Sequence, residues 1–268
     1  MRQVRICDPS EVLQRLPVWE AWCESRLIDS LSRHPRWLLV LRDGLKHTPY
    51  CLEVEADGRT AGLLPLEFVA SRLFGRFLVG LPYLNVGGVT TDGPEAATAL
   101  LDSAVQLADE LDVRHLELRH EAEVPHRTLN KTLSSKVHMR LALPDHHDGL
   151  WKSFKPGVRN QIRKGEKQEF TVLWGAEERL EDFYAVFSQN MRDLGTPVFG
   201  RRLFRAILRH FAGSAEFCVV RAGRRPVAAA LLCHGRGVTE VPSASSLREV
   251  NSTNANMYLY WQLLQRAV

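Results

Sequence analysis

The sequence of 268 residues lacks the features that mark several large classes of protein. No stretch approaches about eighteen consecutive apolar residues, so no membrane-spanning helix is expected. The first residues, MRQVRICDPSEVLQRLP, contain no apolar run with a small-residue cleavage site, so no secretory signal peptide is expected. The five cysteines are scattered and form no C-x-x-C pair. They predict reduced thiols and a cytoplasmic location, not a disulfide scaffold or a zinc site.

Signatures of several catalytic mechanisms are also missing. The ten histidines have no metal-ligand spacing, and His146 and His147 are adjacent, so no metal site is expected. No G-x-S-x-G nucleophile motif occurs, which favours direct transfer without a covalent enzyme intermediate. Catalysis would then depend on positioning and charge stabilisation. No Arg/Gln-x-x-Gly-x-Gly/Ala cradle for the pyrophosphate of coenzyme A is present, which counts against a standard acetyl-CoA enzyme. No tightly bound cofactor is expected.

Positive charge is scarce overall and concentrated in one place. Lys and Arg total 35 and Asp and Glu total 31, a net charge of +4, so the chain is not expected to coat nucleic acid or to bind DNA. The segment 152–167, KSFKPGVRNQIRKGEK, is the exception. In a helix that begins at Pro156, Arg159, Arg163 and Lys167 lie four residues apart on one face and repel one another.

Two interpretations of this basic segment stay open. It is either a solvated helix face or a site for a phosphate or diphosphate, which the planar guanidinium group pairs through two oxygens at once. In the second case Asn160 adds a neutral donor to the cations, which are Lys152, Lys155, Arg159, Arg163 and Lys164.

A repeated order of elements predicts two lobes. In the first half, apolar runs over 50–54 and 61–69 flank an Asp57-Gly58 turn, which indicates a β-hairpin. A strand and a glycine-rich loop are expected within 76–89 and further strands over 114–120 and 136–144, and a helix begins at Pro94 and reaches Leu111. In the second half the corresponding elements are a hairpin around Gly223-Arg224, a strand over 238–246 and a helix over 254–268.

This pattern predicts an α/β (α+β) fold of two similar lobes, each a mixed β-sheet flanked by helices. The expected lobes are residues 1–145 and 146–268, divided near the polar segment between Pro144 and Gly149. The first lobe continues past its helix with two more strands, whereas the second stops at its helix. We therefore expect the second lobe to lack its last strands, as in a truncated chain.

Polar segments near expected helix ends are the other candidates. Leu194-Gly195 is expected to end a helix over 182–191, and Thr196 begins a loop that is either a plain terminator or the lining of a cleft. The segments EVPSASS (240–246) and NSTNAN (251–256) offer donors near a helix N-terminus, which suits an anion. A simple N-cap is the alternative there.

These segments, taken in order, resemble the FemAB family. The resemblance rests on GRTAGLLPLEFVASRLFGRFLVGLPYLNVGG, NQIRKGEK, NMRDLGTPVF, EVPSASSLREVN and NMYLYWQLLQRA, and it is greatest for the branch associated with PEP-CTERM/exosortase and exopolysaccharide systems. It implies tandem GNAT-like lobes. It also implies transfer of an acyl or aminoacyl group from aminoacyl-tRNA or acyl-CoA to an amine of a phosphate-bearing envelope or polysaccharide precursor. Relatives continue into strands that carry a reactive lysine, which is not in this sequence.

The resemblance and the residues together predict a set of site residues. The phosphate would be bound by Lys152, Arg159, Asn160, Arg163 and Lys164; the acceptor cleft would be lined by Tyr83, Asn85, Asp193 and Thr196; the donor side would hold Ser243, Ser245, Asn256 and Tyr258. No general base stands out, and Asp193 and Glu240 are the acids to test. Two other functions stay open. They are a catalytically inactive GNAT-fold protein that binds an envelope precursor or a partner, and an RNA-binding protein whose basic face contacts tRNA.

Overall fold

The protein is described by a computed structural model that covers residues 3–26, 31–135 and 137–268. The chain divides into two compact units, Met1–His138 and Met139–Val268. Each unit contains its own β-sheet with helices packed on it. The mixed α/β fold with two sheets, expected from the repeated order of elements, is confirmed.

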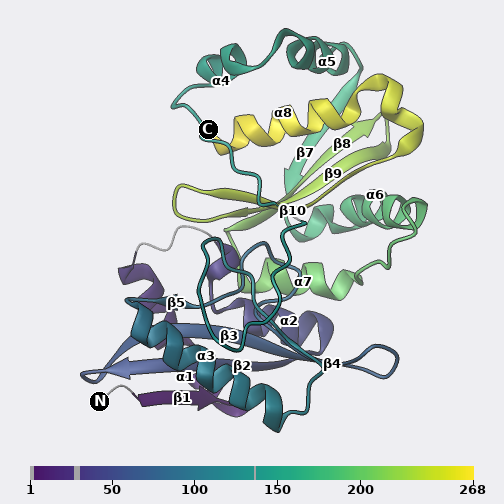
Figure 1. Cartoon of the computed structure of the whole chain (residues 1–268). Helices are drawn as coiled ribbons and strands as arrows, with labels where there is room; N and C mark the ends of the chain where they lie inside the picture. The colour runs from purple at the N-terminus through teal and green to yellow at the C-terminus, as the bar shows by residue number, and fades with distance from the viewer. Residues whose placement is uncertain (1–2, 27–30, 136) are drawn as a thin grey trace. The chain divides into compact units, whose positions relative to one another are not determined.

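The sheet of unit 1 has the strand order β1-β2-β3-β4-β6, with β5 paired to β3 (Figure 1). Its strands are β1 (Gln3–Cys7), β2 (Thr48–Ala56), β3 (Arg59–Ser71), β4 (Gly75–Val79), β5 (Thr90–Thr91) and β6 (Leu116–Glu117). The predicted hairpin is confirmed, because β2 and β3 pair antiparallel around the turn. Asp57 and Gly58 both have positive φ, 53° and 71°, as a tight two-residue hairpin turn requires.

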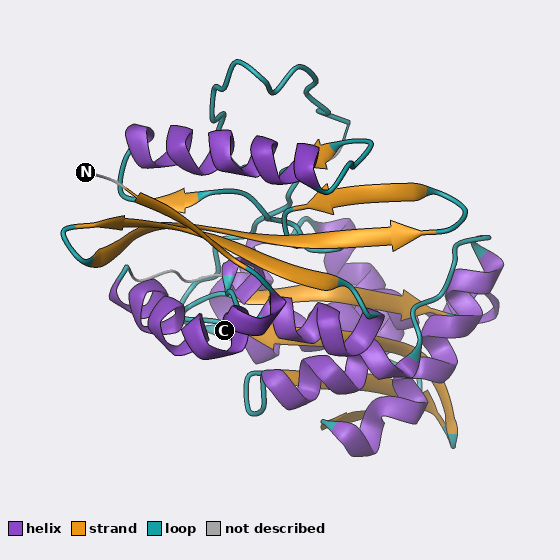
Figure 2. Ribbon diagram, turned by 90° about the horizontal axis from the view of Figure 1, so that it is seen from below, coloured by secondary structure: helices purple, strands orange, loops and turns teal. Residues whose placement is uncertain are grey.

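Helices cover both faces of this sheet (Figure 2). They are α1 (Pro9–Ser25), α2 (Trp37–Leu45), α3 (Pro94–Glu110) and the short 3-10 helix η1 (Leu31–Arg33). Leu52, Leu64 and Leu78 form the core with α3, whose first residue is Pro94 as predicted. On the other face, buried Glu53 accepts hydrogen bonds from Arg15 and Trp19 of α1, at 2.6 and 2.9 Å.

The sheet of unit 2 has the order β10-β9-β8-β7. Its strands are β7 (Phe170–Gly175), β8 (Ala215–Ala222), β9 (Arg225–His234) and β10 (Thr239–Ser246). The second predicted hairpin is also confirmed, since β8 and β9 pair antiparallel around a turn in which Gly223 has a φ of 59°. Strand β10, predicted over 238–246, pairs with β9 across a register shift between Glu240 and Ser243.

The helices of unit 2 lie on opposite faces of its sheet. They are α4 (His147–Ser153), α5 (Pro156–Glu166), α6 (Leu180–Asp193), α7 (Arg201–His210), α8 (Ala255–Ala267) and the 3-10 helices η2 (Glu177–Arg179) and η3 (Arg248–Thr253). Leu259 and Leu263 of α8 pack with Ala230 and other sheet residues in one core. On the other face, Phe183 of α6 stacks on Phe217 of β8, with 4.5 Å between ring centroids.

The internal repeat is visible in the order of elements. Strand β1, helices α1 and α2, hairpin β2–β3, strand β4 and helix α3 correspond to β7, α6, α7, β8–β9, β10 and α8. In both sheets the third strand of the run pairs with the second strand of the hairpin. The sequence pattern therefore identified one supersecondary unit that the chain uses twice.

Two of the expected strands need correction. Of the strand expected over 114–120, only Leu116–Glu117 pairs, parallel to β4, and Arg119 adds an isolated bridge to Gly87. The strand expected over 136–144 is wrong for the described residues 137–144, and Lys136 lies outside them. Val137 and Met139 alternate as strand residues would, but they are 79% and 83% exposed. A segment with alternating apolar residues forms a strand only where it can pair with a sheet edge and pack its apolar side chains into a core.

None of the helices in the described part of the chain is long and apolar enough to cross a membrane.

Candidate functional site

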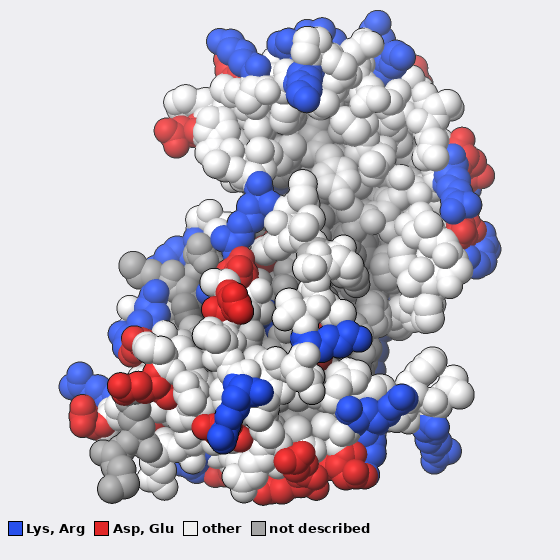
Figure 3. Space-filling view, viewed as in Figure 1, with Lys and Arg blue, Asp and Glu red and all other residues white. Residues whose placement is uncertain are grey.

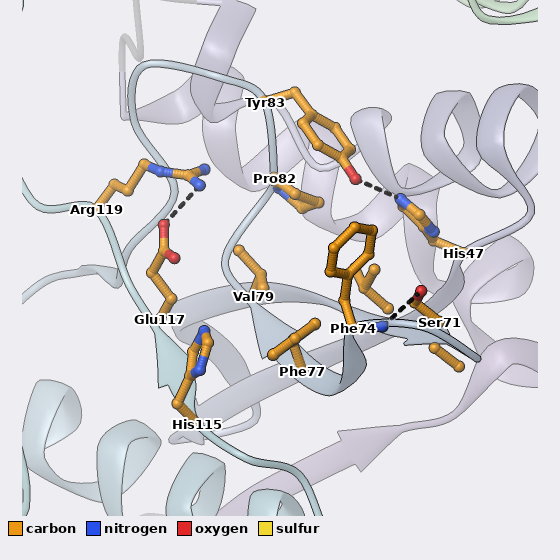
Figure 4. A pocket seen from close by; sticks show the side chains of 12 residues that line it. His47, Ser71, Phe74, Phe77, Val79, Pro82, Tyr83, His115, Glu117 and Arg119 are labelled. Atoms are coloured by element: carbon orange, nitrogen blue, oxygen red, sulfur yellow. Dashed lines mark hydrogen bonds and ion pairs between the residues drawn. The ribbon is translucent and has the colours of Figure 1, made fainter. Parts of the chain in front are cut away.

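Unit 1 contains a cavity of about 470 Å³ on the sheet face opposite α3 (Figure 4). Its apolar lining comes from Val69, Ala70, Phe74, Phe77, Val79 and Pro82. Its polar lining comes from His47, Ser71, Tyr83, His115, Glu117 and Arg119. An apolar cavity with a few convergent polar groups is the usual form of a small-molecule site.

A strained loop after β4 carries Tyr83 to this cavity. Leu81 and Tyr83 have positive φ values of 40° and 70°, which are costly for residues with large side chains. Arg119 holds the loop, because its Nη1 donates to the carbonyl of Leu81 at 3.1 Å and its Nη2 pairs with Glu117 at 2.6 Å. Such strain persists only where surrounding contacts over-determine it, and it is concentrated at functional sites.

Two of the polar groups that line the cavity, His47 and Tyr83, form an uncharged pair. His47 Nε2 and the Tyr83 hydroxyl are hydrogen-bonded at 3.1 Å. Burial lowers the pKa of His47, so its imidazole is neutral at pH 7. Burial also raises the pKa of Tyr83; the Arg119 charge opposes this rise and the Glu67 charge adds to it. The pair can therefore donate and accept hydrogen bonds without carrying net charge.

Glu67 is a buried acid beside the cavity. It is fully buried on β3, its Cα is paired across the strands with Val79, and it lies two residues before Val69, so all three share one sheet face. Neither carboxyl oxygen has a hydrogen-bond partner among the described residues. Burial raises the pKa of Glu67 well above its ordinary value, although the Arg42 charge opposes the rise. Burial therefore favours the protonated, neutral form of this side chain.

Of the predicted acceptor residues in unit 1, the structure places Tyr83 in the cavity lining and Asn85 on the exposed loop after it. Sequence reasoning missed His47, Arg119 and Glu67. One signal was available, since Glu67 is the single charged residue in the apolar run LLPLEFV. A charged residue in such a run indicates either that the run is not a buried strand or that the charged group is buried at a functional site.

The basic segment of unit 2 forms the end of α4 and the whole of α5, as expected from Pro156 onward. Side chains of Lys152, Arg163 and Lys164 are exposed, and Arg159 is half-buried. Among the described residues none of these four cations pairs with a carboxylate. Figure 3 shows Lys and Arg gathered where α4 and α5 lie in Figure 1. The charge of this surface, which we call the α4–α5 basic surface, is thus not neutralised internally.

Close packing on α8 holds the α4–α5 basic surface in place. A Cβ on Gly165 of α5 would lie 2.8 Å from the Cβ of Tyr258, so only glycine lets the two helices approach this closely. Trp151 of α4 packs on Trp261 of α8 with 5.2 Å between ring centroids, and the Arg163 guanidinium lies 5.4 Å from the Trp151 ring centroid. Arg163 is therefore partly positioned by a cation–π contact.

A second polar group lies on the α6 face of the unit 2 sheet. Helix α6 ends as predicted: Gly195 has a φ of 67°, and the N–H groups of Gly195 and Thr196 donate to the carbonyls of Arg192 and Met191. Asn190 of α6 donates to the buried Ser245 hydroxyl of β10 at 3.2 Å. Asn190 is the residue of this group that sequence reasoning missed.

The predicted donor-side residues are not brought together. The register places Ser243 and Ser245 on the face that packs on α6, whereas Asn256 and Tyr258 belong to α8, which covers the other face. Tyr258 lies against α5, so it belongs with the α4–α5 basic surface. The four were grouped because they lie close in sequence, but the turn from β10 into α8 carries the chain across the sheet.

The two predicted acids also differ in setting. Asp193, at the last turn of α6, accepts hydrogen bonds from Arg192 at 3.0 and 3.2 Å. Glu240 lies at the start of β10, opposite Cys233, and is 8% exposed. No group of three or more potential metal ligands occurs in the described part of the chain.

The segment before α8 fits the pyrophosphate of coenzyme A poorly. Residues 248–253 form η3 and contain no glycine, so side chains stand where a glycine-rich loop would turn its N–H groups toward an anion. Asn254, which precedes α8, has a φ of 59° and makes no side-chain capping bond. These residues therefore form no glycine-rich cradle for a pyrophosphate.

Comparison with known proteins places these sites in context. Residues 152–268 match the family model described as an acetyltransferase (GNAT) domain. No curated protein matches the sequence. The crystal structure of FemX is similar over 94% of this chain and 84% of its own, with a TM-score of 0.66 and 16% identity. The C-terminal domain (DUF2156) of a putative lysylphosphatidylglycerol synthetase from Agrobacterium fabrum is similar over 97% and 74%, with a TM-score of 0.53 and 11% identity. At these identities the likeness is one of fold, so the chain has a FemX-like fold whose residues 152–268 match a GNAT acetyltransferase domain.

Proposed function

We propose that this protein transfers an activated acyl or aminoacyl group to an amine of a phosphate-bearing acceptor in cell-envelope or exopolysaccharide biosynthesis. The match of residues 152–268 to a GNAT domain supports acyl transfer as the reaction class. The FemX-like fold supports a tandem arrangement of two such lobes. A role beside the PEP-CTERM/exosortase system, and a place in the cytoplasm, are part of the proposal and rest on the sequence resemblance.

The observation that carries the proposal is the α4–α5 basic surface. Arg159 and Arg163 are one helical turn apart, and Lys152 and Lys164 flank them, all without a carboxylate partner among the described residues. Like charges at this spacing destabilise a helix unless an anion lies between them. A phosphate or diphosphate on the acceptor would relieve that repulsion through paired, charge-assisted hydrogen bonds.

In the reaction the neutral acceptor amine attacks the donor carbonyl, a C–N bond forms and the C–O or C–S bond of the ester or thioester breaks. The amine nitrogen loses one proton, and the departing oxygen or sulfur takes one up. Asn190 and the Ser245 hydroxyl are neutral groups on the α6 face that could orient a polar donor, and Asp193 is the nearby acid to test for proton removal. The Tyr83 cavity of unit 1 is our assignment for a separate small apolar ligand. The donor is an aminoacyl-tRNA or an acyl-CoA, and the poor fit of η3 to a pyrophosphate favours testing the former first.

The test is ligand-induced thermal stabilisation of the 268-residue protein by a uridine diphosphate sugar, acetyl-CoA and bulk tRNA in parallel. A ligand at about 100 times its Kd adds about 2.7 kcal/mol of apparent stability. We expect stabilisation by the diphosphate sugar and its loss in Arg159→Gln/Arg163→Gln, because each charge-assisted bond contributes about 1.5–3 kcal/mol.

The matched control is Arg201→Gln/Arg205→Gln. These arginines are also four residues apart on one helix, α7, but they pair with Glu181 and Glu177 at 2.9 and 2.8 Å. The control removes the same charge and should keep the stabilisation. Equal loss in both variants would indicate nonspecific charge attraction and would contradict the proposal. Stabilisation by tRNA alone, with a steep salt dependence, would support the RNA-binding alternative instead.

A further inference from the structure

The loop between β3 and β4 presents two large apolar side chains to solvent. Leu73 is 81% exposed and Phe74 is 64% exposed. Figure 1 shows this loop projecting beyond the end of β4, and Figure 3 shows uncharged side chains at its tip with Lys and Arg beside them. Adjacent exposed apolar side chains at a projecting tip mark an interaction surface more often than a passive one.

This exposure is built into the loop by specific contacts. The Ser71 hydroxyl accepts hydrogen bonds from the N–H groups of Leu73 and Phe74, at 3.3 and 3.2 Å. Arg114 Nη1 donates to the carbonyl of Phe74 at 3.0 Å. Gly75 has a φ of 101°, and its Cα lies so close to the Arg114 side chain that a Cβ would approach Cδ to 2.7 Å. The backbone therefore holds both apolar side chains outward.

Cations border the tip. Arg72 is exposed and pairs with no carboxylate among the described residues. Arg76 is offset by Asp112 at 3.3 Å, and Arg114 donates to the Phe74 carbonyl but pairs with no acid in the described ranges. Counting only the residues that the structure describes, two of these three arginines thus have no carboxylate partner beside the apolar surface.

We propose that the β3–β4 tip docks on an anionic lipid surface, with Leu73 and Phe74 in the interfacial region and Arg72 and Arg114 toward lipid phosphates. A protein partner fits less well, because a stable protein interface covers about 800 Å² on each side and two side chains on a convex tip provide far less. Lipid needs only a small apolar insertion and nearby cations.

Phe74 also links the tip to the cavity. Its ring lies over the cavity in Figure 4, near Pro82 and His47, while more than half of its surface is exposed. The apolar surface is therefore continuous from the tip into the cavity. Docking at the tip would bring the cavity mouth to the lipid surface. This inference goes beyond the proposed function, since lipid docking requires no acyl transfer.

The test is flotation of the 268-residue protein with vesicles of phosphatidylcholine alone or mixed with phosphatidylglycerol. We expect binding to the anionic vesicles and a loss of about tenfold or more in Leu73→Ser/Phe74→Ser, because two apolar side chains no longer insert. Arg72→Gln should weaken binding roughly fivefold at low salt and little at high salt. The control is Leu13→Ser/Val18→Ser on α1, which also replaces two exposed apolar side chains, 57% and 44% exposed.

The control should bind as the natural protein does. Absence of vesicle binding by the natural protein would overturn the proposal, and so would equal losses in the tip and control variants. A tip variant that changes the oligomeric mass while vesicle binding persists would assign the tip to a protein contact and overturn it as well. Because the diphosphate-sugar test uses other residues and no lipid, failure here is distinguishable from failure of the proposed function.

Discussion

Glu67→Gln should be more stable than the natural protein at pH 8, and its advantage should disappear as the pH falls toward 4.5. Burial raises the pKa of Glu67 in the folded protein well above the ordinary value of 4.5. Between these two pKa values the folded state keeps a proton that the unfolded state releases. The natural protein therefore loses up to about 1.4 kcal/mol of unfolding free energy for each pH unit of increase.

Glutamine cannot ionise, so the unfolding free energy of the variant should decrease less steeply with rising pH than that of the natural protein. The measurement is the free energy of unfolding by denaturant at pH 5, 6.5 and 8 for the natural protein and the variant. Equal slopes in the two proteins would show that the Glu67 carboxyl has a partner or is hydrated, and the prediction would be wrong.

The same substitution at Glu53 is the matched control. Glu53 is equally buried on the neighbouring strand, but it accepts hydrogen bonds from Arg15, Trp19 and Thr60. Removing its charge leaves Arg15 with Glu55, at 3.0 Å, as its remaining carboxylate partner and weakens the hydrogen bonds that Glu53 accepts, so Glu53→Gln should destabilise the protein by about 2 kcal/mol or more. Two buried glutamates on one sheet face should therefore respond with opposite signs at pH 8.

An opposite response would bear on function. A buried acid that lowers stability and has no partner is retained at a site more often than in a plain core. Glu67 shares its sheet face with Val69 and Val79 of the cavity lining. If Glu67→Gln is more stable at pH 8 but loses thermal stabilisation by one of the tested ligands (the diphosphate sugar, acetyl-CoA or tRNA), the cavity and the acid belong to one site.

Gly87→Ala should unfold unit 1 or destabilise it by about 4 kcal/mol or more. The strained loop after β4 begins at Gly80 and returns at Gly87, where the two backbones come so close that a Cβ on either glycine overlaps the carbonyl oxygen of the other. Backbone cannot move aside as a flexible side chain can. The N–H groups of Gly80 and Gly87 also donate to the carbonyls of Glu117 and Arg119, at 2.8 and 3.0 Å. Displacement would break these bonds as well.

The measurement is thermal unfolding of Gly87→Ala followed by circular dichroism, beside Gly93→Ala. Gly93 has an extended φ of −179°, and a Cβ there meets nothing within 4 Å, so its substitution should change stability by about 0.5 kcal/mol or less. Similar melting of the two variants would mean that the loop relaxes without cost, contrary to the packing described.

Several local features follow from the sequence alone. The Asp57-Gly58 and Gly223-Arg224 turns between apolar runs predicted both hairpins. Tight hairpin turns require positive φ, which glycine, asparagine and aspartate adopt more readily than other residues. Pro94 marked the start of α3 and Gly195 the end of α6 for similar reasons. Cations at positions 152–167 predicted a charged helix face, since helical spacing depends on sequence separation only.

Tertiary structure decided the rest, because it depends on what each residue meets across the fold. The alternating segment 137–144 forms no strand, since no sheet edge receives it. Ser245 and Tyr258 look adjacent in sequence but lie on opposite faces of one sheet. In the sequence Glu67 is only a charged residue within an apolar run, whereas in the fold it is buried, with β2 and β4 on either side of its strand. Burial, unlike turn chemistry, is a property of the assembled neighbours, and so the cavity and its buried acid emerged only from the folded chain.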